Sequence, residues 1–599
     1  MFFNLLMAKA KKKPEYTELA YLESTGTQWI DTGIAFQPIK AVIEVCFNEE
    51  VKTRQIMGFS SYNTTYFGKA ANGVFEVGGG ITLNNTINPY EWQTVEFTHN
   101  GILNQGICKL TVDGKTITRQ NPITGQPSNF WLFNVPGYGT TLACHCKIRS
   151  AKFYNPDTNE LISDFIPVLD KDLEPCMYDK VKGKYHNNGG TGEFKWRLLN
   201  QLEYLESDGN QYINLGIIPN DTMGVKVKFY VNSASGKNYV VGSRGAGVGR
   251  FYLYSTESSN YVRYGWGTFY TTNITPVVGT PVEASLNYLN DRKYIYNGTE
   301  VNSNLANQDF SGNTYDMYLF SANFANVFYN DAILKGRIYY CEITEGDKVI
   351  MDLIPVLDKN LVACMYDKVS GKYFYNQGDG EFKWKLPNQL EYLESDGNQY
   401  LLTDYYPNSN TAIEVDYFPN PSSVFNCIYG TQSNGNTKRF YALISSLNYR
   451  LQISSMNTSY YYGLDGVGGL IYQGQGFTSS QIRVVLTVDN HNKLIRTVTD
   501  DGTVDYDMTS VNGLGQVDCE YPLVIFNRGT AGVVNQTNGY KGRIYSYKIW
   551  ESDKLIQYLI PVLDENLTPC MYDLVSKQYL RNQGTGSFKG SDDNSLIGS

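Results

Sequence analysis

The chain has 599 residues, a formal net charge of −9 and an aromatic content of 14%. This length exceeds what one hydrophobic core serves, so several domains are expected. The acidic balance argues against nucleic acid bound through a basic face, and the lack of any run of about eighteen apolar residues argues against membrane insertion.

The N-terminal segment "MFFNLLMAKAKKKPE" covers residues 1–15. Its lysines follow a short apolar stretch, which is the reverse of the order in a signal peptide. Either Met1 or Met7 serves as the natural start. We expect a solvated tail here, and the alternative is a peptide that docks on a larger assembly.

Two motifs then recur three times along the chain, one opening and one closing each copy. The opening motif reads "ELAYLESTGTQWIDTGI" at 18–34, "QLEYLESDGNQYINLGI" at 201–217 and "QLEYLESDGNQYLLTDY" at 389–405. The closing motif reads "IPVLDKDLEPCMYDKVKGKY" at 166–185, "IPVLDKNLVACMYDKVSGKY" at 354–373 and "IPVLDENLTPCMYDLVSKQY" at 560–579. A period far longer than the roughly 20–50 residues of solenoids indicates whole domains in tandem. The predicted domains are residues 16–198, 199–386 and 387–590, followed by a polar tail at 591–599.

Inside each copy, short runs of Tyr, Thr, Val and Ile alternate with period two and end at Gly, Asn or Pro. Long segments with a helical period are missing, so the pattern predicts one all-β sandwich per copy. The connections at 196–200 and 384–388 lack the Gly and Ser of flexible linkers, which favours closely joined domains.

The order of "LEYLES", "KGRIY", "IPVLD", "MYDKVSGKY" and "NQGTG" resembles laminin-G-like, concanavalin-A-type jelly-roll domains. More narrowly, it resembles the version found in structural proteins of gut bacteriophages and in surface proteins of gut bacteria. The resemblance covers residues 16–590. It implies three tandem jelly rolls that recognise glycans or proteins at their loops and concave face, with bound calcium in some members. The closing motif itself indicates no particular ligand.

From this resemblance we expect a non-enzymatic bacteriophage virion structural protein, made in the host cytoplasm: a capsid decoration, head fibre or tail-associated fibre. Its expected partners are other virion proteins, through the N-terminal tail, and host or mucosal glycans. The alternatives are a bacterial cell-surface or secreted glycan-binding adhesin and an architectural spacer without a ligand. Head or tail location and homo-oligomerisation stay open.

An enzyme is the alternative that the glucanases of this superfamily raise. Their catalytic strand carries carboxylates that flank the sugar bond. The nearest match, "EVDYFPN", supplies Glu414 and Asp416 but has Phe418 where a further Glu is needed. We therefore predict no catalytic residues.

The closing motif has three positions of chemical interest that recur in all copies: the Asp of "PVLD" (Asp170, Asp358, Asp564), the Asp of "MYD" (Asp179, Asp367, Asp573) and a Cys (Cys176, Cys364, Cys570). Calcium needs several converging oxygens, whereas an Asp that caps a turn needs only backbone N–H groups, so capping is preferred. The cysteines lack metal-binding spacing and are expected in the core of a protein folded in a reducing compartment. We expect no metal site and no cofactor, with calcium left open.

The candidate ligand-binding residues are aromatic. The segment "YVRYGWGTFY" places Tyr264, Trp266 and Tyr270 on one side of a strand, and "SYYYG" supplies Tyr460, Tyr461 and Tyr462 in the region taken to correspond. The first copy has Gly78–Gly80 there instead. A feature absent from one copy suggests specialisation, and exposed rings can stack on sugars. The alternative, which we prefer, is that these rings fill the sandwich core.

Overall fold

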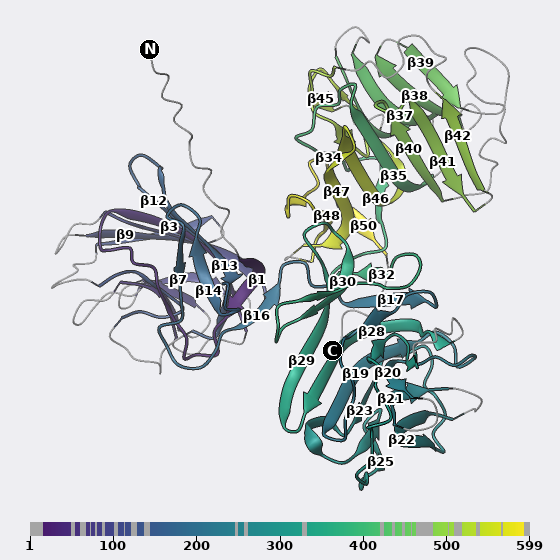
Figure 1. The fold of residues 1–599 in the computed structure, drawn as a ribbon. Helices are drawn as coiled ribbons and strands as arrows, with labels where there is room; N and C mark the ends of the chain where they lie inside the picture. The colour runs from purple at the N-terminus through teal and green to yellow at the C-terminus, as the bar shows by residue number, and fades with distance from the viewer. Residues whose placement is uncertain are drawn as a thin grey trace, which may run out of the picture. The chain divides into compact units, whose positions relative to one another are not determined.

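The protein is described by a computed structural model in which nearly all regular structure is β (Figure 1). The described residues are 16–48, 54–59, 67–71, 74–77, 81–86, 90–100, 106–112, 114–120, 128–136, 144–245, 249–256, 261–325, 332–419, 425–433, 438–445, 450–456, 458–462, 483–500, 502–507, 518–534, 539–564 and 567–591. Within these ranges the helical structure is limited to 3-10 geometry, in η2 (Tyr288–Asn290) and at Ala332. Neither is long enough to cross a membrane.

The first copy of the motifs frames one large and one small sheet. The large sheet contains β1 (Thr17–Glu23), β3 (Ile39–Phe47), β8 (Trp92–His99), β9 (Ile107–Val112), β10 (Lys115–Gln120), β12 (Cys146–Tyr154), β13 (Leu161–Leu169), β14 (Pro175–Asp179), β15 (Lys184–His186) and β16 (Lys195–Leu198). The small sheet contains β2 (Ile30–Asp31), β4 (Arg54–Gly58), β5 (Phe67–Ala71), β6 (Val74–Val77), β7 (Ile81–Thr86) and β11 (Trp131–Leu132). We call these two sheets the first sheet pair.

The second sheet pair repeats this plan. Its large sheet contains β17 (Tyr204–Asp208), β19 (Met223–Val231), β23 (Val282–Leu286), β24 (Tyr294–Tyr296), β25 (Thr299–Asn302), β28 (Lys335–Glu345), β29 (Lys348–Leu357), β30 (Ala363–Asp367), β31 (Tyr373–Phe374) and β32 (Lys383–Lys385). Its small sheet contains β18 (Ile213–Asn214), β20 (Val241–Arg244), β21 (Arg250–Ser255), β22 (Arg263–Thr271), β26 (Tyr318–Leu319) and β27 (Asn323–Phe324).

The third sheet pair has the same plan with a larger second sheet. Its large sheet contains β33 (Leu393–Asp396), β35 (Thr411–Pro419), β40 (Val484–Asp489), β41 (Leu494–Thr499), β42 (Gly502–Asp507), β46 (Lys541–Glu551), β47 (Lys554–Leu563), β48 (Pro569–Asp573), β49 (Tyr579–Leu580) and β50 (Lys589–Gly590). Its small sheet contains β34 (Leu401–Leu402), β36 (Phe425–Gln432), β37 (Arg439–Ser445), β38 (Arg450–Met456), β39 (Thr458–Tyr462), β43 (Val524–Ile525), β44 (Gly529–Thr530) and β45 (Val533–Val534).

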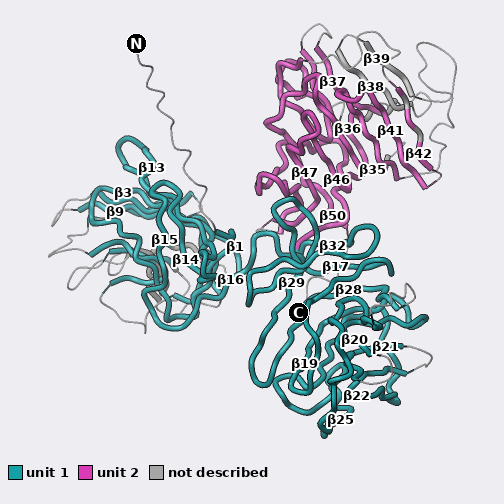
Figure 2. The backbone as a smooth tube through the Cα atoms, in the orientation of Figure 1, with its two compact units in different colours: residues 1–387 teal, residues 388–599 magenta. Residues whose placement is uncertain are grey.

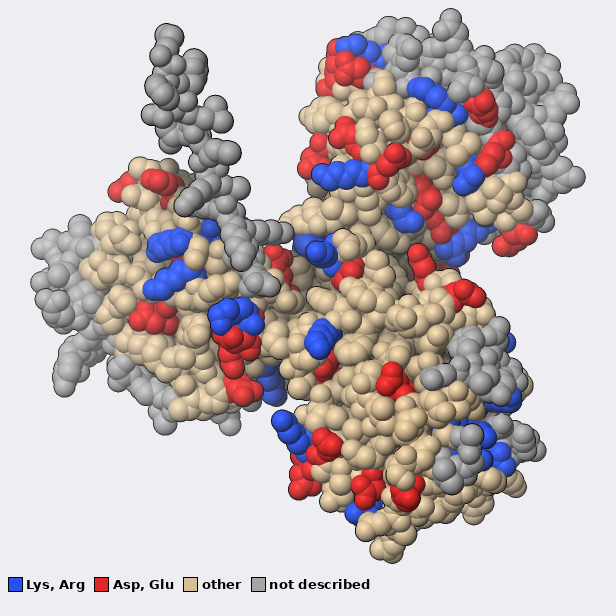
Figure 3. Space-filling view, in the orientation of Figure 1, with Lys and Arg blue, Asp and Glu red and all other residues tan. Residues whose placement is uncertain are grey.

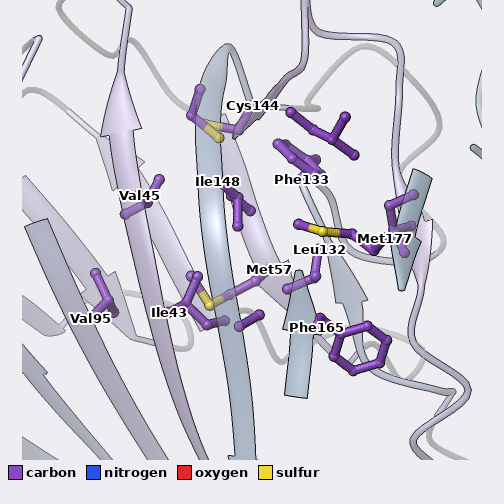
Figure 4. Packing of buried hydrophobic residues seen from close by; sticks show 14 of the residues in the cluster. Ile43, Val45, Met57, Val95, Leu132, Phe133, Cys144, Ile148, Phe165 and Met177 are labelled. Carbon is purple, nitrogen blue, oxygen red and sulfur yellow. The ribbon is translucent and has the colours of Figure 1, made fainter. Parts of the chain in front are cut away.

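The core of each pair lies between its two sheets. Along β3 the burial alternates, because successive side chains of a strand point to opposite faces. Figure 4 shows the result in the first pair: apolar side chains of the large sheet meet those of the small sheet, among them Ile43, Val45, Val95, Ile148, Met57 and Leu132. The predicted all-β class is therefore confirmed, with sheets that are almost entirely antiparallel.

The opening motif of each copy is hydrogen-bonded to the loop that follows the closing motif, which we call the closing loop (residues 186–194, 374–382 and 580–588). A buried Gln of the opening motif donates its Nε2 to a backbone carbonyl of the closing loop: Gln28 to Glu193 at 3.0 Å, Gln211 to Asp379 at 3.1 Å and Gln399 to Thr585 at 3.2 Å. An Asn of the closing loop accepts the backbone N–H of the next aromatic residue: Asn188 from Trp29, Asn376 from Tyr212 and Asn582 from Tyr400. We call this set the opening–closing contact, and it joins the two ends of each copy.

The recurrent Asp of "MYD" holds backbone N–H groups, as the capping interpretation predicts. Asp179 is fully buried, and its Oδ1 accepts from Asp164 N at 3.2 Å and Val181 N at 3.0 Å. The other copies repeat this pattern, with Asp367 bonded to Asp352 N and Val369 N, and Asp573 to Tyr558 N and Val575 N. A carboxylate oxygen thus satisfies donors that the hairpin would otherwise leave buried without a partner.

All ten cysteines are buried and present as thiols. Burial raises the pKa of Cys176 and of Cys364 to about 12 each, because desolvation disfavours the thiolate. These thiols behave as small apolar core groups.

The chain divides into two compact units, residues 1–387 and 388–599 (Figure 2). The division into three domains at 16–198, 199–386 and 387–590 stays a prediction. The expected tails lie largely outside the described residues, since 1–15 and 592–599 are not among them.

Candidate functional site

Two of the predicted site residues, Trp266 and Tyr264, lie in the core of the second sheet pair. Trp266 is 0% exposed and donates its Nε1 to the carbonyl oxygen of Ala306 at 2.6 Å. The ring of Tyr264 stacks on that of Tyr294 in the facing sheet, with 4.0 Å between centroids. Both rings lie where the preferred alternative placed them, in the sandwich core, and neither leaves a face for a sugar.

Tyr270 lies at the outer end of the same stack. Its ring is 5.0 Å from that of Tyr264 and nearly parallel to it, at 12°. It is half-buried. The prediction that Tyr270 shares a side with Tyr264 therefore agrees with the structure, although most of its ring area serves packing.

The register of the strands corrects the correspondence with the third copy. Trp266 pairs with Phe251, and the equivalent partner of Phe440 is Ser455. Tyr460, Tyr461 and Tyr462 instead lie on β39, the next strand of that sheet. Their side chains fall outside the described residues, as does the whole of the predicted glycine segment 78–80.

The exposed ring on β22 is Phe269, which sequence reasoning missed. Its side chain is 45% exposed. The guanidinium groups of Arg250, on β21, and Arg263, at the start of β22, each lie 5.1 Å from its ring centroid. At this distance a cation is attracted by the face of an aromatic ring. We call these three residues the Arg–Phe–Arg cluster.

A turn at Gly267 explains why Phe269 lies beside Arg263. Gly267 has φ +69°, a left-handed conformation that favours glycine over residues with a Cβ. Beyond it the chain runs back, since Thr272 N donates to the Val262 carbonyl at 2.9 Å. The one signal in the sequence was this glycine inside a strand pattern, which often marks a bend.

Arg263 is held in place by its own strand. Its Nε donates to Thr271 Oγ1 at 3.0 Å, while its terminal nitrogens have no protein partner among the described residues. Neither Arg250 nor Arg263 has a carboxylate partner within the described part of the chain. Other arginines of the sheets do, as the pairs Arg149–Glu44, Arg337–Glu206, Arg483–Asp416, Arg496–Asp505, Arg543–Glu394 and Arg581–Asp564 demonstrate. On the face drawn in Figure 3, basic and acidic side chains are likewise interspersed.

The carboxylates considered for catalysis are engaged in ion pairs. Glu414 lies 2.8 Å from Lys548, and Asp416 makes two bonds to Arg483, at 2.8 and 2.6 Å. The side chain of Phe418 follows on the same strand, as the sequence indicated. A general acid must carry a proton, whereas each of these two carboxylates is bound by a cationic side chain.

The corresponding strand of the first copy carries Glu44, which is also paired. Burial opposes its ionisation, but hydrogen bonds from Arg149 and Ser150 leave the pKa of Glu44 below its ordinary value. It is therefore ionised and bound at neutral pH. Among the described residues there is no group of three or more His, Cys, Asp or Glu placed to hold a metal ion.

The comparisons with known proteins returned solved structures only. No protein-family model matches the chain. No curated protein matches it either. Among the solved structures is the mouse laminin alpha1 chain, domains LG4-5, with 10% identity over 63% of this chain and 96% of that chain and a TM-score of 0.23.

Two further structures belong to bacterial proteins. One, from Bacteroides ovatus, is named a "putative carbohydrate binding protein"; it has 10% identity over 59% of this chain and 93% of that chain, with a TM-score of 0.24. The other is a mutant of NanB sialidase from Streptococcus pneumoniae, with 11% identity over 94% of this chain and 93% of that chain and a TM-score of 0.17.

The chain is similar to laminin-G-like domains, as its motifs indicated, and these names agree with that resemblance. At TM-scores this low the matches carry no argument about ligand or activity. The fold class rests on the chain's own sheets.

Proposed function

We propose that this protein is a non-enzymatic structural protein of a bacteriophage virion whose jelly rolls bind glycans. The single observation that carries the glycan-binding part is the exposed ring of Phe269 between two arginine side chains. An exposed ring offers the apolar face on which a sugar can stack, and polar groups around it fix the orientation of the sugar.

The absence of enzymatic activity is supported by the state of the candidate carboxylates. Glu414 and Asp416 are bound by Lys548 and Arg483, and Phe418 occupies the position where a further carboxylate would be needed. Hydrolysis of a glycosidic bond requires two carboxyl groups in complementary protonation states. Release of reducing sugar from a panel of β-glucans, abolished by Glu414→Gln, would overturn this part.

The virion part is supported by the motif resemblance. The basic N-terminal segment, residues 1–15, is the proposed contact with other virion proteins, and the protein is made in the host cytoplasm. Mass spectrometry of purified virions tests this directly. Detection only in host-cell membranes or in the culture supernatant would contradict it and favour the adhesin.

Glycan binding is tested with the full chain on a glycan array, beside Phe269→Ala. The matched control is Tyr406→Ala, because Tyr406 is an exposed ring of similar exposure, 51%, in the third copy. We expect Phe269→Ala to lose binding and Tyr406→Ala to keep it. Equal signals from both variants, or no binding by the unaltered chain, would reject the site.

A further inference from the structure

The ligand chemistry of the Arg–Phe–Arg cluster follows from its charge. Six arginines of the described residues form ion pairs with a carboxylate, with donor–acceptor distances of 2.6–2.9 Å. Arg250 and Arg263 have no such partner among the described residues, although the whole chain carries a net charge of −9. Two cations on one exposed ring leave a local positive potential in an otherwise acidic protein.

The positions of the two guanidinium groups also restrict the kind of ligand that the cluster can bind. Both guanidinium groups lie 5.1 Å from the centroid of the same ring, so a single ligand that covers Phe269 can contact either of them. The Nε of Arg263 is already bonded to Thr271, which fixes the side chain and leaves its terminal N–H groups for a ligand. A guanidinium presents a planar fork of donors that matches a carboxylate in two parallel hydrogen bonds.

We propose that the Arg–Phe–Arg cluster binds a sugar that carries a carboxylate, with the apolar face of the sugar ring on Phe269 and the carboxylate on Arg263 and Arg250. This inference rests on the proposed glycan binding and names its substrate class.

The third copy lacks the same combination. Met456 lies opposite Arg439 as Gly267 lies opposite Arg250. Counting along the chain from these two residues, Gln452 corresponds to Arg263 and Thr458 to Phe269, although a register shift between Tyr252 and Ser255 occurs in the second copy alone of the two. Arg439 is the counterpart of Arg250. The acidic-sugar site therefore belongs to the second copy, and the third copy supplies the natural replacements for testing it.

The experiment measures binding of the full chain to sugar pairs in which only the carboxylate is changed: trigalacturonic acid against its methyl ester, and sialyllactose against its methyl ester. We expect the carboxylated member to bind about tenfold or more tightly, because a hydrogen bond to a charged group contributes about 1.5–3 kcal/mol. The preference should shrink as salt is raised.

Three variants assign this preference to the cluster. Arg263→Gln should reduce binding of the carboxylated sugar about tenfold and leave the neutral sugar unchanged, and Arg263→Lys should recover part of the loss, since it keeps the charge but not the fork. Arg496→Gln is the control, because it removes the same charge from an exposed arginine that is paired with Asp505. It should leave binding unchanged.

The outcomes separate this inference from the proposed function. If neutral and carboxylated sugars bind equally, or a sulfated lactose binds more tightly than either, the carboxylate assignment is wrong. If Phe269→Ala abolishes binding of a neutral glycan while Arg263→Gln has no effect, the proposed glycan binding is kept and the proposal of a carboxylated sugar is rejected. If no sugar binds the full chain, both fail.

Discussion

The opening–closing contact and the Arg–Phe–Arg cluster are opposite kinds of feature. The first recurs in all three copies with the same Gln, the same Asn and distances that differ by 0.2 Å at most. The second is described in the second copy, on the exposed side of a strand whose other side is core. The recurring contact is buried and bonded to backbone, whereas the cluster is exposed and its arginines have no carboxylate partner among the described residues.

This difference separates folding from recognition. A buried amide that bonds the backbone at both ends of a copy cannot be exchanged without leaving polar groups unsatisfied. An exposed ring and two arginines cost the fold little when they change, so each copy is free to acquire its own ligand. The opening–closing contact is therefore a feature of the fold that all three copies share.

The largest effect is expected from removing one side of the opening–closing contact. Residues 199–386 expressed alone should unfold cooperatively, whereas residues 199–375 should not fold, because β32 and the partners of Gln211 and Tyr212 are lost. Circular dichroism during heating measures both. A cooperative transition in the shorter product would show that closure is dispensable, and a disordered longer product would contradict the domain boundaries.

The next effect concerns the buried side of β22. Trp266→Ala should destabilise the second copy by about 3–5 kcal/mol, since it empties a fully buried site and leaves the carbonyl of Ala306 without its donor. Calorimetry of the full chain should register one transition at lower temperature. An unchanged melting profile would mean that the ring is not core.

A single member of the opening–closing contact should have a smaller effect. Gln211 is 2% exposed, and its amide both accepts from Asp208 N and donates to the Asp379 carbonyl. Gln211→Ala should cost about 1–3 kcal/mol in the same transition. The control is Thr268→Ala on the exposed surface, for which the expected change is below about 0.5 kcal/mol.

The sequence predicted the recurring features well and the single one poorly. Alternating runs and repeated motifs are local patterns, so they revealed the all-β class, the buried Cys364 and the turn-capping Asp367. The turn at Gly267, where φ is +69°, interrupts the alternation of buried and exposed side chains along β22. Period-two reasoning therefore selected Trp266 and passed over Phe269.

A buried histidine distinguishes the first copy. Desolvation lowers the pKa of His99 from its ordinary 6.5 to about 4. Between these two values His99 is protonated in the unfolded chain but not in the folded chain. The free energy of unfolding of the first copy should therefore fall as pH drops from 6.5 towards 4. Unfolding of the full chain at pH steps through this window measures it. His99→Gln should reduce the dependence and leave the part due to His186, whose pKa is also lowered by burial. The same slope in that variant would refute the assignment.

The smallest effect on stability is expected at Phe269. Because its side chain is 45% exposed, Phe269→Ala should change the free energy of unfolding by about 0.5 kcal/mol or less, in contrast to Trp266→Ala three residues earlier. Thermal unfolding of the two variants side by side is the measurement. A large loss of stability in Phe269→Ala would show that this ring contributes to the fold and would contradict its assignment to ligand recognition.

The buried thiols of the closing motif can also be used to measure local opening of the fold. Cys176, Cys364 and Cys570 occupy equivalent hairpins and are each 0% exposed, so a thiol reagent can reach them only after that hairpin opens. When reclosing is faster than modification, the labelling rate is the opening equilibrium multiplied by the intrinsic rate of the exposed thiol. Mass spectrometry distinguishes the three cysteine-containing peptides. One labelling time course therefore reports the local opening equilibrium of each hairpin within the intact chain.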